Sequence, residues 1–198
     1  MVAASKFGPT LKTKTQAAMP SRPHAGFARR IARLARELGV PADYAVARRL
    51  APQREASRLV TVGRAPDDRK IVRLAPRAAV AWRAMSRAAA DDGIVLLAMS
   101  GFRSVTRQTQ IIRLKLAAGQ SLASIMRLVA APGFSEHHTG CALDLSSSPD
   151  PDLEVDFAQT AAYRWLRRRA HEFGFHLSFP RGNPHGIGYE PWHWLWRK

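Results

Sequence analysis

Apolar residues recur at helical spacing over several stretches of this chain. The first stretch begins at Phe27, where apolar positions three or four residues apart alternate with arginines until Gly39 and Pro41 end the run. Pro76 fits the first turn of a further helix, and Ser104 fits the N-cap of the next one. The pattern predicts helices over residues 27–38, 42–50, 76–90, 105–118, 121–130 and 157–173.

Short apolar or alternating runs between these helices predict strands. Residues 94–99 form a continuous apolar run, which is typical of a buried strand. Other strands are predicted over residues 58–62, 70–74, 141–145, 175–179 and 192–196, and a loop over residues 146–152. Because helices and short strands are mixed and the strands need not be parallel, we expect an α+β fold. Its sheet should be small, mostly antiparallel and flanked by helices.

The length and charge of the chain limit its organisation and its partners. With 198 residues, it is long enough for one compact domain with an extension, and we expect a monomer. Its net charge of +16 implies an anionic partner, and nucleic acid, a membrane surface and an anionic cell-wall polymer all fit. The single cysteine, Cys141, excludes an intramolecular disulfide and a zinc knuckle of paired cysteines.

No part of the sequence has the composition of a membrane span, which takes roughly 18 consecutive apolar residues, or of a secretory signal. We therefore expect a cytoplasmic protein, with the cell-wall compartment as the alternative if translation starts elsewhere or release is non-classical. Residues 1–25 contain no acidic residue and are predicted to form a basic, disordered tail. Residues 26–72 are predicted as an extension of helices and a hairpin, and residues 73–198 as the main domain.

Two short motifs far apart in the chain carry most of its candidate chemistry. The first reads Ser-Glu-His-His-Thr-Gly-Cys-Ala-Leu-Asp over residues 135–144, and the second reads Tyr-Glu-Pro-Trp-His-Trp over residues 189–194. Together they offer two imidazoles and one carboxylate, from His137, Asp144 and His193. Such a set leaves the fourth position of a zinc ion open for water, as catalytic zinc requires. The remaining carboxylate, Glu190, would act as a base beside that water.

The sequence around each motif favours this arrangement. Gly140 permits a sharp or left-handed turn between the histidine of the first motif and the strand that follows. Pro191 bars regular strand pairing and can bend the backbone, so that Glu190 and His193 could face one site. On a strand, both tryptophans beside His193 would face away from it. An aromatic wall near Glu190 would raise the pKa of its carboxyl by desolvation.

Further positions extend the similarity to a known family. The first motif fills every fixed position of the signature S-x-H-x-x-G-x-A-x-D, and Glu-Pro-Trp-His at residues 190–193 is similar to the second signature of that family. The turn over residues 100–104, followed by Gln108, is similar to its S-G-Y-R-S…Q segment. From about Leu74 to Trp196, the chain resembles the zinc D-alanyl-D-alanine carboxypeptidases of the lysostaphin, D-Ala-D-Ala and hedgehog group. That group includes the vancomycin-resistance carboxypeptidases and dipeptidases.

The resemblance implies a fold like that of these peptidases and a role for each motif residue. One Zn²⁺ per chain would be bound by His137, Asp144 and His193. Glu190 would be the catalytic base, and Arg103 would hold or polarise a substrate oxygen, since a fixed guanidinium stabilises developing negative charge. Ser135 and Gln108 would position the substrate. His138 occupies a variable position and would be solvent-facing or support a ligand.

The resemblance leaves several activities open. We expect a zinc-dependent D-alanyl-D-alanine carboxypeptidase that acts on peptidoglycan-derived peptides. An L-alanyl-D-glutamate endopeptidase or a D,D-dipeptidase on the same site is the alternative, because cleft length rather than motif separates these activities. The charge would instead suit a protein of another class, which binds nucleic acid or another anionic polymer without catalysis and could dispense with Glu190. We expect no specific nucleic acid partner.

Overall fold

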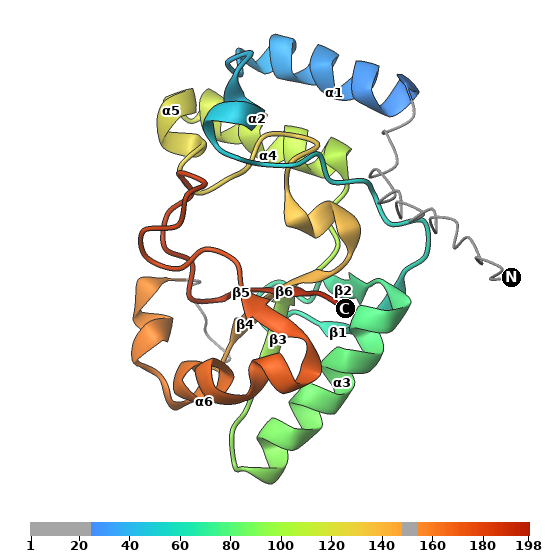
Figure 1. Cartoon of the computed structure of the whole chain (residues 1–198), viewed down its shortest axis with the longest axis vertical. Coiled ribbons are helices and arrows are strands. Elements are labelled where there is room, and N and C mark those ends of the chain that lie inside the picture. The colour runs from blue at the N-terminus through green and yellow to red at the C-terminus, as the bar shows by residue number, and fades with distance from the viewer. Residues whose placement is uncertain (1–24, 148–153) are drawn as a thin grey trace, which may run out of the picture.

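The computed structural model describes residues 25–147 and 154–198 (Figure 1). The tail expected over residues 1–25 lies outside them except for Ala25, and so does most of the loop expected over residues 146–152. Within the described residues, no helix combines the length and the apolar character needed to cross a membrane.

A four-stranded antiparallel sheet carries two of the candidate site residues (Figure 1). Its strands, in spatial order, are β3 (Leu97–Ser100), β4 (Ala142–Ser146), β6 (His193–Trp196) and β5 (Phe175–Leu177). β4 and β6 are the inner strands, and their register places Asp144 opposite His193. Strand pairing thus makes neighbours of two residues that are 49 positions apart in the sequence.

The main core lies among the sheet, two helices and a hairpin. α3 (Pro76–Asp91) contacts both strands of the hairpin formed by β1 (Val60–Arg64) and β2 (Ile71–Leu74), and this hairpin contacts β3. The core residues from α3, β4, α6 (Ala161–Arg169) and β5 include Met85, Leu143, Leu145, Trp165 and Phe175. Because side chains alternate along a strand, β4 buries its two leucines on one face and presents Asp144 on the other.

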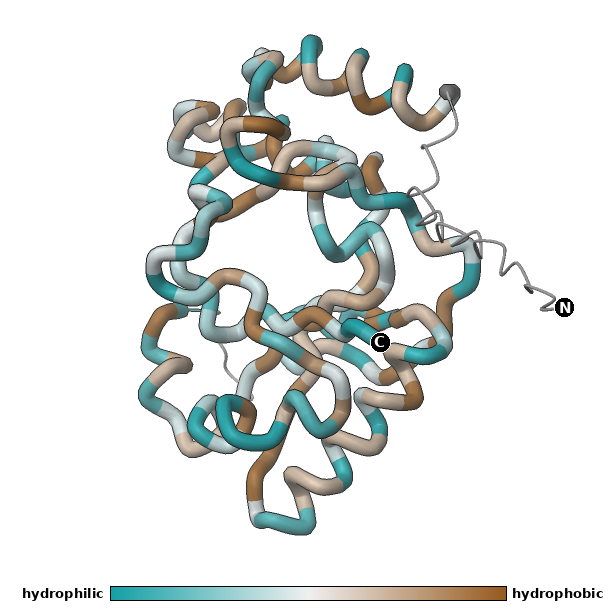
Figure 2. The backbone as a smooth tube through the Cα atoms, viewed as in Figure 1, coloured by the Kyte–Doolittle hydropathy of each residue, from teal (hydrophilic) through white to brown (hydrophobic). Residues whose placement is uncertain are grey.

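A second group of helices gathers at the end of the molecule away from α3 and α6 (Figure 1). It consists of α1 (Ala25–Leu38), α2 (Tyr44–Ala47), α4 (Val105–Ala117) and α5 (Leu122–Ile125). Along α1, hydrophobic positions alternate with hydrophilic ones, as expected of an amphipathic helix (Figure 2). The buried apolar residues of this group form a second cluster, which includes Leu38, Tyr44, Ile112, Ile125 and Met126.

The α+β class with small antiparallel sheets flanked by helices is confirmed, but the single helix expected over residues 157–173 is wrong. The structure divides that stretch into η2 (Val155–Gln159), α6 and η3 (Ala170–Phe173). Thr160 has extended backbone angles, and its hydroxyl accepts a hydrogen bond from the Tyr163 amide, so it begins a new helix. The helices expected over residues 42–50 and 121–130 are shorter than predicted, since they end at Ala47 and Ile125.

Candidate active site

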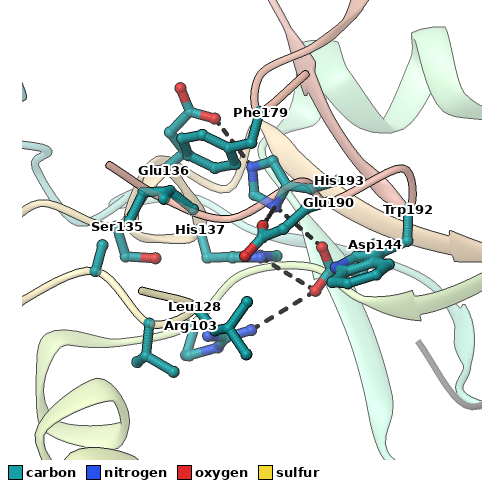
Figure 3. A pocket seen from close by; sticks show the side chains of 13 residues that line it. Arg103, Leu128, Ser135, Glu136, His137, Asp144, Phe179, Glu190, Trp192 and His193 are labelled. Atoms are coloured by element: carbon teal, nitrogen blue, oxygen red, sulfur yellow. Dashed lines mark hydrogen bonds and ion pairs between the residues drawn. The ribbon is translucent and has the colours of Figure 1, made fainter. Parts of the chain in front are cut away.

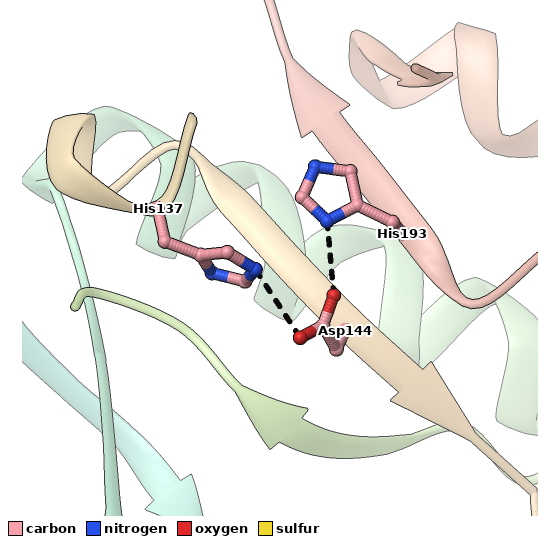
Figure 4. Close-up of side chains that lie close together, drawn as sticks. All are labelled: His137, Asp144 and His193. Carbon is pink, nitrogen blue, oxygen red and sulfur yellow. Dashed lines mark hydrogen bonds and ion pairs between the residues drawn. The ribbon is translucent and has the colours of Figure 1, made fainter. Parts of the chain in front are cut away.

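Three candidate ligand side chains converge where β4 pairs with β6. Asp144 lies between two histidines: its Oδ2 atom is 3.2 Å from His137 Nε2, and its Oδ1 atom is 3.0 Å from His193 Nδ1 (Figure 4). All three residues are buried, and one candidate ligand atom from each lies within 4.8 Å of the others. Two imidazoles and one carboxylate form a ligand set that zinc takes in catalytic sites. The residues present therefore fit a zinc ion.

A tight turn brings His137 to the strand that carries Asp144. His137 lies in η1 (Glu136–Thr139), and Gly140 ends this element in the left-handed region at φ 67°. A Cβ atom on this glycine would come within 2.9 Å of the Ala75 nitrogen, whose N–H donates to the Gly140 carbonyl oxygen at 2.8 Å. Both the backbone angle and the available space therefore require glycine at position 140.

Hydrogen bonds on the outer side of each histidine ring orient the ring. His137 Nδ1 lies 2.6 Å from the Gly101 carbonyl oxygen, which can only accept, so Nδ1 donates and Nε2 faces Asp144. His193 Nε2 lies 2.9 Å from Glu136 Oε2 and donates to this carboxylate, so Nδ1 faces Asp144 (Figure 3). Contacts of this kind on the outer nitrogen are typical of histidines that bind metal ions.

The charges around the three candidate ligands stabilise a cation. Burial by itself would raise the pKa of Asp144, but the two histidines beside it hold that pKa well below its usual range. Burial likewise disfavours the charged form of His193, yet its hydrogen bonds to Asp144 and Glu136 raise its pKa to about 10. A metal ion that binds here therefore displaces a proton from His193.

Glu190 supplies a second carboxyl group beside the ligands. It is buried, and its Oε2 atom lies 3.9 Å from His193 Nδ1. Burial raises the pKa of Glu190 to about 7, against the opposing effect of His193. The Glu190 amide donates to the Phe179 carbonyl oxygen, which anchors the backbone just before β6 begins. A carboxyl group that titrates near neutral pH can both take and return a proton, as a general base must.

The guanidinium of Arg103 points into the same site. Its Nη2 atom lies 3.7 Å from Asp144 Oδ2 and donates to the Ser100 hydroxyl at 3.3 Å. Its Nη1 atom donates to Gln108 Oε1 at 3.1 Å. Gln108 is buried, and its side-chain amide also donates to the Ala130 carbonyl oxygen at 2.6 Å. Gln108 therefore fixes the position of the Arg103 guanidinium.

The three candidate ligands, Glu190 and Arg103 line one pocket of about 200 Å³ (Figure 3). Ser135 and Glu136 border it beside the histidines. The rest of its wall is mainly apolar and is formed by Leu128, Val129, Ala130, Phe179, Ile187 and Trp192. The pocket is smaller than the roughly 300–1,000 Å³ of typical small-molecule sites, which favours a substrate end with small side chains.

The pocket brings together six of the seven residues singled out from the sequence, namely Arg103, Ser135, His137, Asp144, Glu190 and His193. Gln108, which was expected to position the substrate, lies behind Arg103 and outside the pocket lining. The expectation that both tryptophans face away from His193 is wrong for Trp192, which lines the pocket. Because β6 begins at His193, the alternation of a strand does not extend to the residue before it.

Two other residues support the site in ways that the sequence pattern did not reveal. His138 is buried, so its solvent-facing alternative is wrong. Its Nε2 accepts from the Gly133 amide at 3.1 Å and its Nδ1 donates to the Arg103 carbonyl oxygen at 2.6 Å, and burial lowers its pKa to about 4. The neutral ring thus supports the turn that carries Arg103. Glu136 orients His193. No sequence pattern indicated this role beyond the position of Glu136 directly before the candidate ligand His137.

Comparisons with known proteins place this site in a family. Residues 71–198 match the family model of VanY, D-alanyl-D-alanine carboxypeptidase. YodJ of Bacillus subtilis strain 168, named only provisionally as a carboxypeptidase, is 39% identical over 121 residues, which cover 59% of this chain and 43% of that protein. A D-alanyl-D-alanine carboxypeptidase of Enterococcus faecalis is 31% identical over 117 residues, which cover 54% of this chain and 42% of that protein. The chain thus spans less than half the length of these curated relatives.

Solved structures share the fold. The LD-carboxypeptidase LdcB, described in terms of peptidoglycan recognition, has a TM-score of 0.65 at 34% identity, covering 72% of this chain and 69% of that chain. A variant of the vancomycin-resistance D,D-pentapeptidase VanY from a VanB-type cassette, in complex with Zn(II), has a TM-score of 0.58 at 25% identity. That match covers 74% of this chain and 82% of the other. Since the family model matches well over half of its residues, the chain belongs to the VanY family of D-alanyl-D-alanine carboxypeptidases.

Proposed function

We propose that this chain is a zinc-dependent D-alanyl-D-alanine carboxypeptidase that acts on peptidoglycan-derived peptides. The observation that carries the proposal is the convergence of three candidate ligands and the buried Glu190 carboxyl in one small pocket. Membership of the VanY family supports the reaction class, and the Zn(II) complex of a structural relative supports the identity of the metal.

Each group of the site has a definite role in this reaction. His137, Asp144 and His193 would hold the zinc ion, which when bound would supply a Lewis acid for the scissile carbonyl and lower the pKa of the attacking water. Glu190 accepts the proton of that water and passes it to the leaving amine, which its pKa of about 7 favours. Arg103, fixed by Gln108 and Ser100, stabilises the negative charge that develops on the scissile oxygen.

The shape of the pocket favours a carboxypeptidase that removes a small terminal residue. Its mainly apolar wall suits an alanine methyl group, and Ser135 borders it as a polar group that can orient the peptide. The likeness to an LD-carboxypeptidase bears on a second candidate, cleavage after an L-residue at the same site. The configuration of the residue before the terminal D-alanine distinguishes the two.

Matched peptides test this proposal. One series ends in D-Ala-D-Ala and the other in L-Lys-D-Ala, each with a free or an amidated C-terminus. We expect chelator-sensitive release of D-alanine from the free D-Ala-D-Ala peptide and little release from its amide. Preferential cleavage of the L-Lys-D-Ala peptide would instead make the chain an L,D-carboxypeptidase. Equal kcat/KM for acid and amide would make it an endopeptidase.

We also propose that the basic surface of the chain associates with an anionic cell-wall polymer. The net charge is +16, and α1 exposes Arg29, Arg33 and Arg36. Attraction between exposed charges is screened by salt. Co-sedimentation with cell walls that carry or lack anionic polymer should therefore differ at low salt and converge at high salt. Binding that ignores both the polymer and the salt would contradict this second proposal.

A further inference from the structure

Two loops face each other at the rim of the active-site pocket. The first, residues 126–131, contributes Leu128, and the second, residues 179–188, contributes Ile187. The loops are in direct contact, because the Gly188 amide donates to the Arg127 carbonyl oxygen at 2.6 Å. A Cβ atom on Gly188 would lie only 3.0 Å from the Leu128 side chain. The distance between these loops therefore sets the width of the pocket on its apolar side.

One arginine from the N-terminal part of the chain joins the two loops. Arg48 Nη1 donates to the Met126 carbonyl oxygen at 2.7 Å in the first loop and to the Gly186 carbonyl oxygen at 2.9 Å in the second. His185 Nδ1 returns a hydrogen bond to the Arg48 carbonyl oxygen at 3.0 Å. Arg48 thus contacts the second loop through both its side chain and its backbone. Hydrogen bonds from a charged donor to fixed backbone carbonyls are stronger than neutral ones.

Tyr44 holds this arginine and the first loop together. Tyr44 is buried, and the guanidinium carbon of Arg48 lies 5.1 Å from the centre of its ring. The Tyr44 hydroxyl accepts a hydrogen bond from the Ala131 amide at 3.0 Å, at the far end of the first loop. The two residues are four positions apart, one turn along α2 and its C-cap, so one short helix carries both contacts.

We propose that Tyr44 and Arg48 form a clamp that sets the spacing of the two loops, and that Arg48 is thereby a positioning residue for substrate binding. Both residues lie outside the stretch 71–198 that matches the family model, so the N-terminal extension shapes a pocket that the family domain provides. The clamp contacts loop residues that lie next to the pocket lining, and none of the candidate metal ligands. It therefore acts on KM rather than on metal binding. The kinetic part of this inference rests on the proposed function; the structural part does not.

Three variants test the clamp. Arg48→Met removes the side-chain hydrogen bonds to both loops and leaves the backbone contact to His185. Arg48→Lys keeps the charge but loses the planar fork, and Arg49→Met is a matched control at an exposed neighbouring arginine. With the D-Ala-D-Ala peptide, Arg48→Met should raise KM roughly tenfold, about the value of one hydrogen bond from a charged group. Arg48→Lys should restore part of this loss. kcat and zinc content should match the wild type in all three variants.

Hydrogen exchange in the zinc-loaded protein provides a readout that is independent of activity. In Arg48→Met, amides of residues 126–131 and 179–188 should exchange faster, while those of β4 and β6 exchange at the wild-type rate. Unchanged loop exchange, unchanged KM, or a general rise in exchange together with loss of zinc would each overturn the clamp. If the wild type hydrolyses no peptide, the proposed function fails, and loop exchange alone decides whether the clamp exists.

Discussion

Glu136 Oε2 lies 2.9 Å from His193 Nε2, and this contact turns the opposite nitrogen of the ring towards the other candidate ligands. Burial would raise the pKa of Glu136, but the hydrogen bond to His193, the charge of that ring and the charge of Arg197 act together to lower that pKa. The carboxylate is therefore ionised and accepts the imidazole hydrogen. Arg197 approaches the other oxygen of Glu136 at 3.7 Å. The ring of His193 is consequently held between two carboxylates.

Glu136→Gln should weaken zinc binding about 10–100-fold, because it removes the charged partner that orients a ligand histidine. Zinc affinity can be measured by competition with a chromophoric chelator. Glu154→Gln is a suitable control, since Glu154 is exposed and lies outside the pocket lining. Equal zinc affinity for Glu136→Gln and the wild type would show that this contact does not support the metal.

Gly140→Ala should destabilise the protein more than Gly93→Ala does. Both glycines have positive φ, 67° and 72°, so alanine is strained at either position. Only at Gly140 would the new Cβ meet the Ala75 nitrogen, whereas nothing lies within 4 Å at Gly93. The additional loss in the free energy of unfolding should be roughly 1–3 kcal/mol, as for other overpacked sites. Denaturant unfolding checks this difference, and equal losses would contradict the close approach at Gly140.

Much of the site could be predicted from the sequence because its ligands belong to short motifs. His137 lies in the turn that leads into β4, and Asp144 lies on that strand. Pro191 marks the bend before His193. The contact between Glu136 and His193 spans 57 residues and depends on how η1 meets β6, so no local pattern predicts it. The role of Arg48 could not be predicted either, because its partners are distant in the sequence. These partners are also backbone carbonyl oxygens, which every residue type has.

The fold shows a similar limit. Helical spacing predicts α3 well, since Pro76 starts it and Asp92-Gly93 follow its last residue. The stretch from 157 to 173 keeps helical spacing through Thr160, yet the structure breaks there because a threonine hydroxyl in extended conformation caps a new helix. Apolar periodicity records which side chains are buried, but not where the backbone stops being helical.

The activity should depend on Glu190 in its ionised form. Burial raises the pKa of Glu190 to about 7, and a bound dication favours the carboxylate and lowers this pKa. As the pH falls through the pKa of Glu190 in the zinc-loaded protein, the base is protonated. The value of kcat/KM should therefore fall on the acid side, with a midpoint below pH 7. Glu190→Gln should lower kcat about 10²–10⁴-fold and abolish this acid limb. The pH profile of kcat/KM, with zinc content measured at each pH, checks both; an acid limb that survives in Glu190→Gln would assign it to another group.

Arg103→Lys should lower kcat although the charge is kept. An ammonium group cannot keep the separate hydrogen bonds that Nη1 and Nη2 make to Gln108 and Ser100, so the charge is no longer fixed in place. Steady-state kinetics with the D-Ala-D-Ala peptide separate two roles. A fall in kcat indicates stabilisation of the oxyanion, whereas a rise in KM at constant kcat indicates that Arg103 binds the substrate in its ground state. The latter result would overturn the role assigned here.

Zinc content after purification tests the central claim most directly. Wild-type protein and Glu190→Gln should each carry one zinc ion per chain, because Glu190 lies beside the candidate ligands His137, Asp144 and His193 rather than among them. The double variant His137→Ala/His193→Ala should carry none, since Asp144 is then the last of the three candidate ligands. Stoichiometric zinc in the double variant would contradict the account, because the metal would then be bound elsewhere.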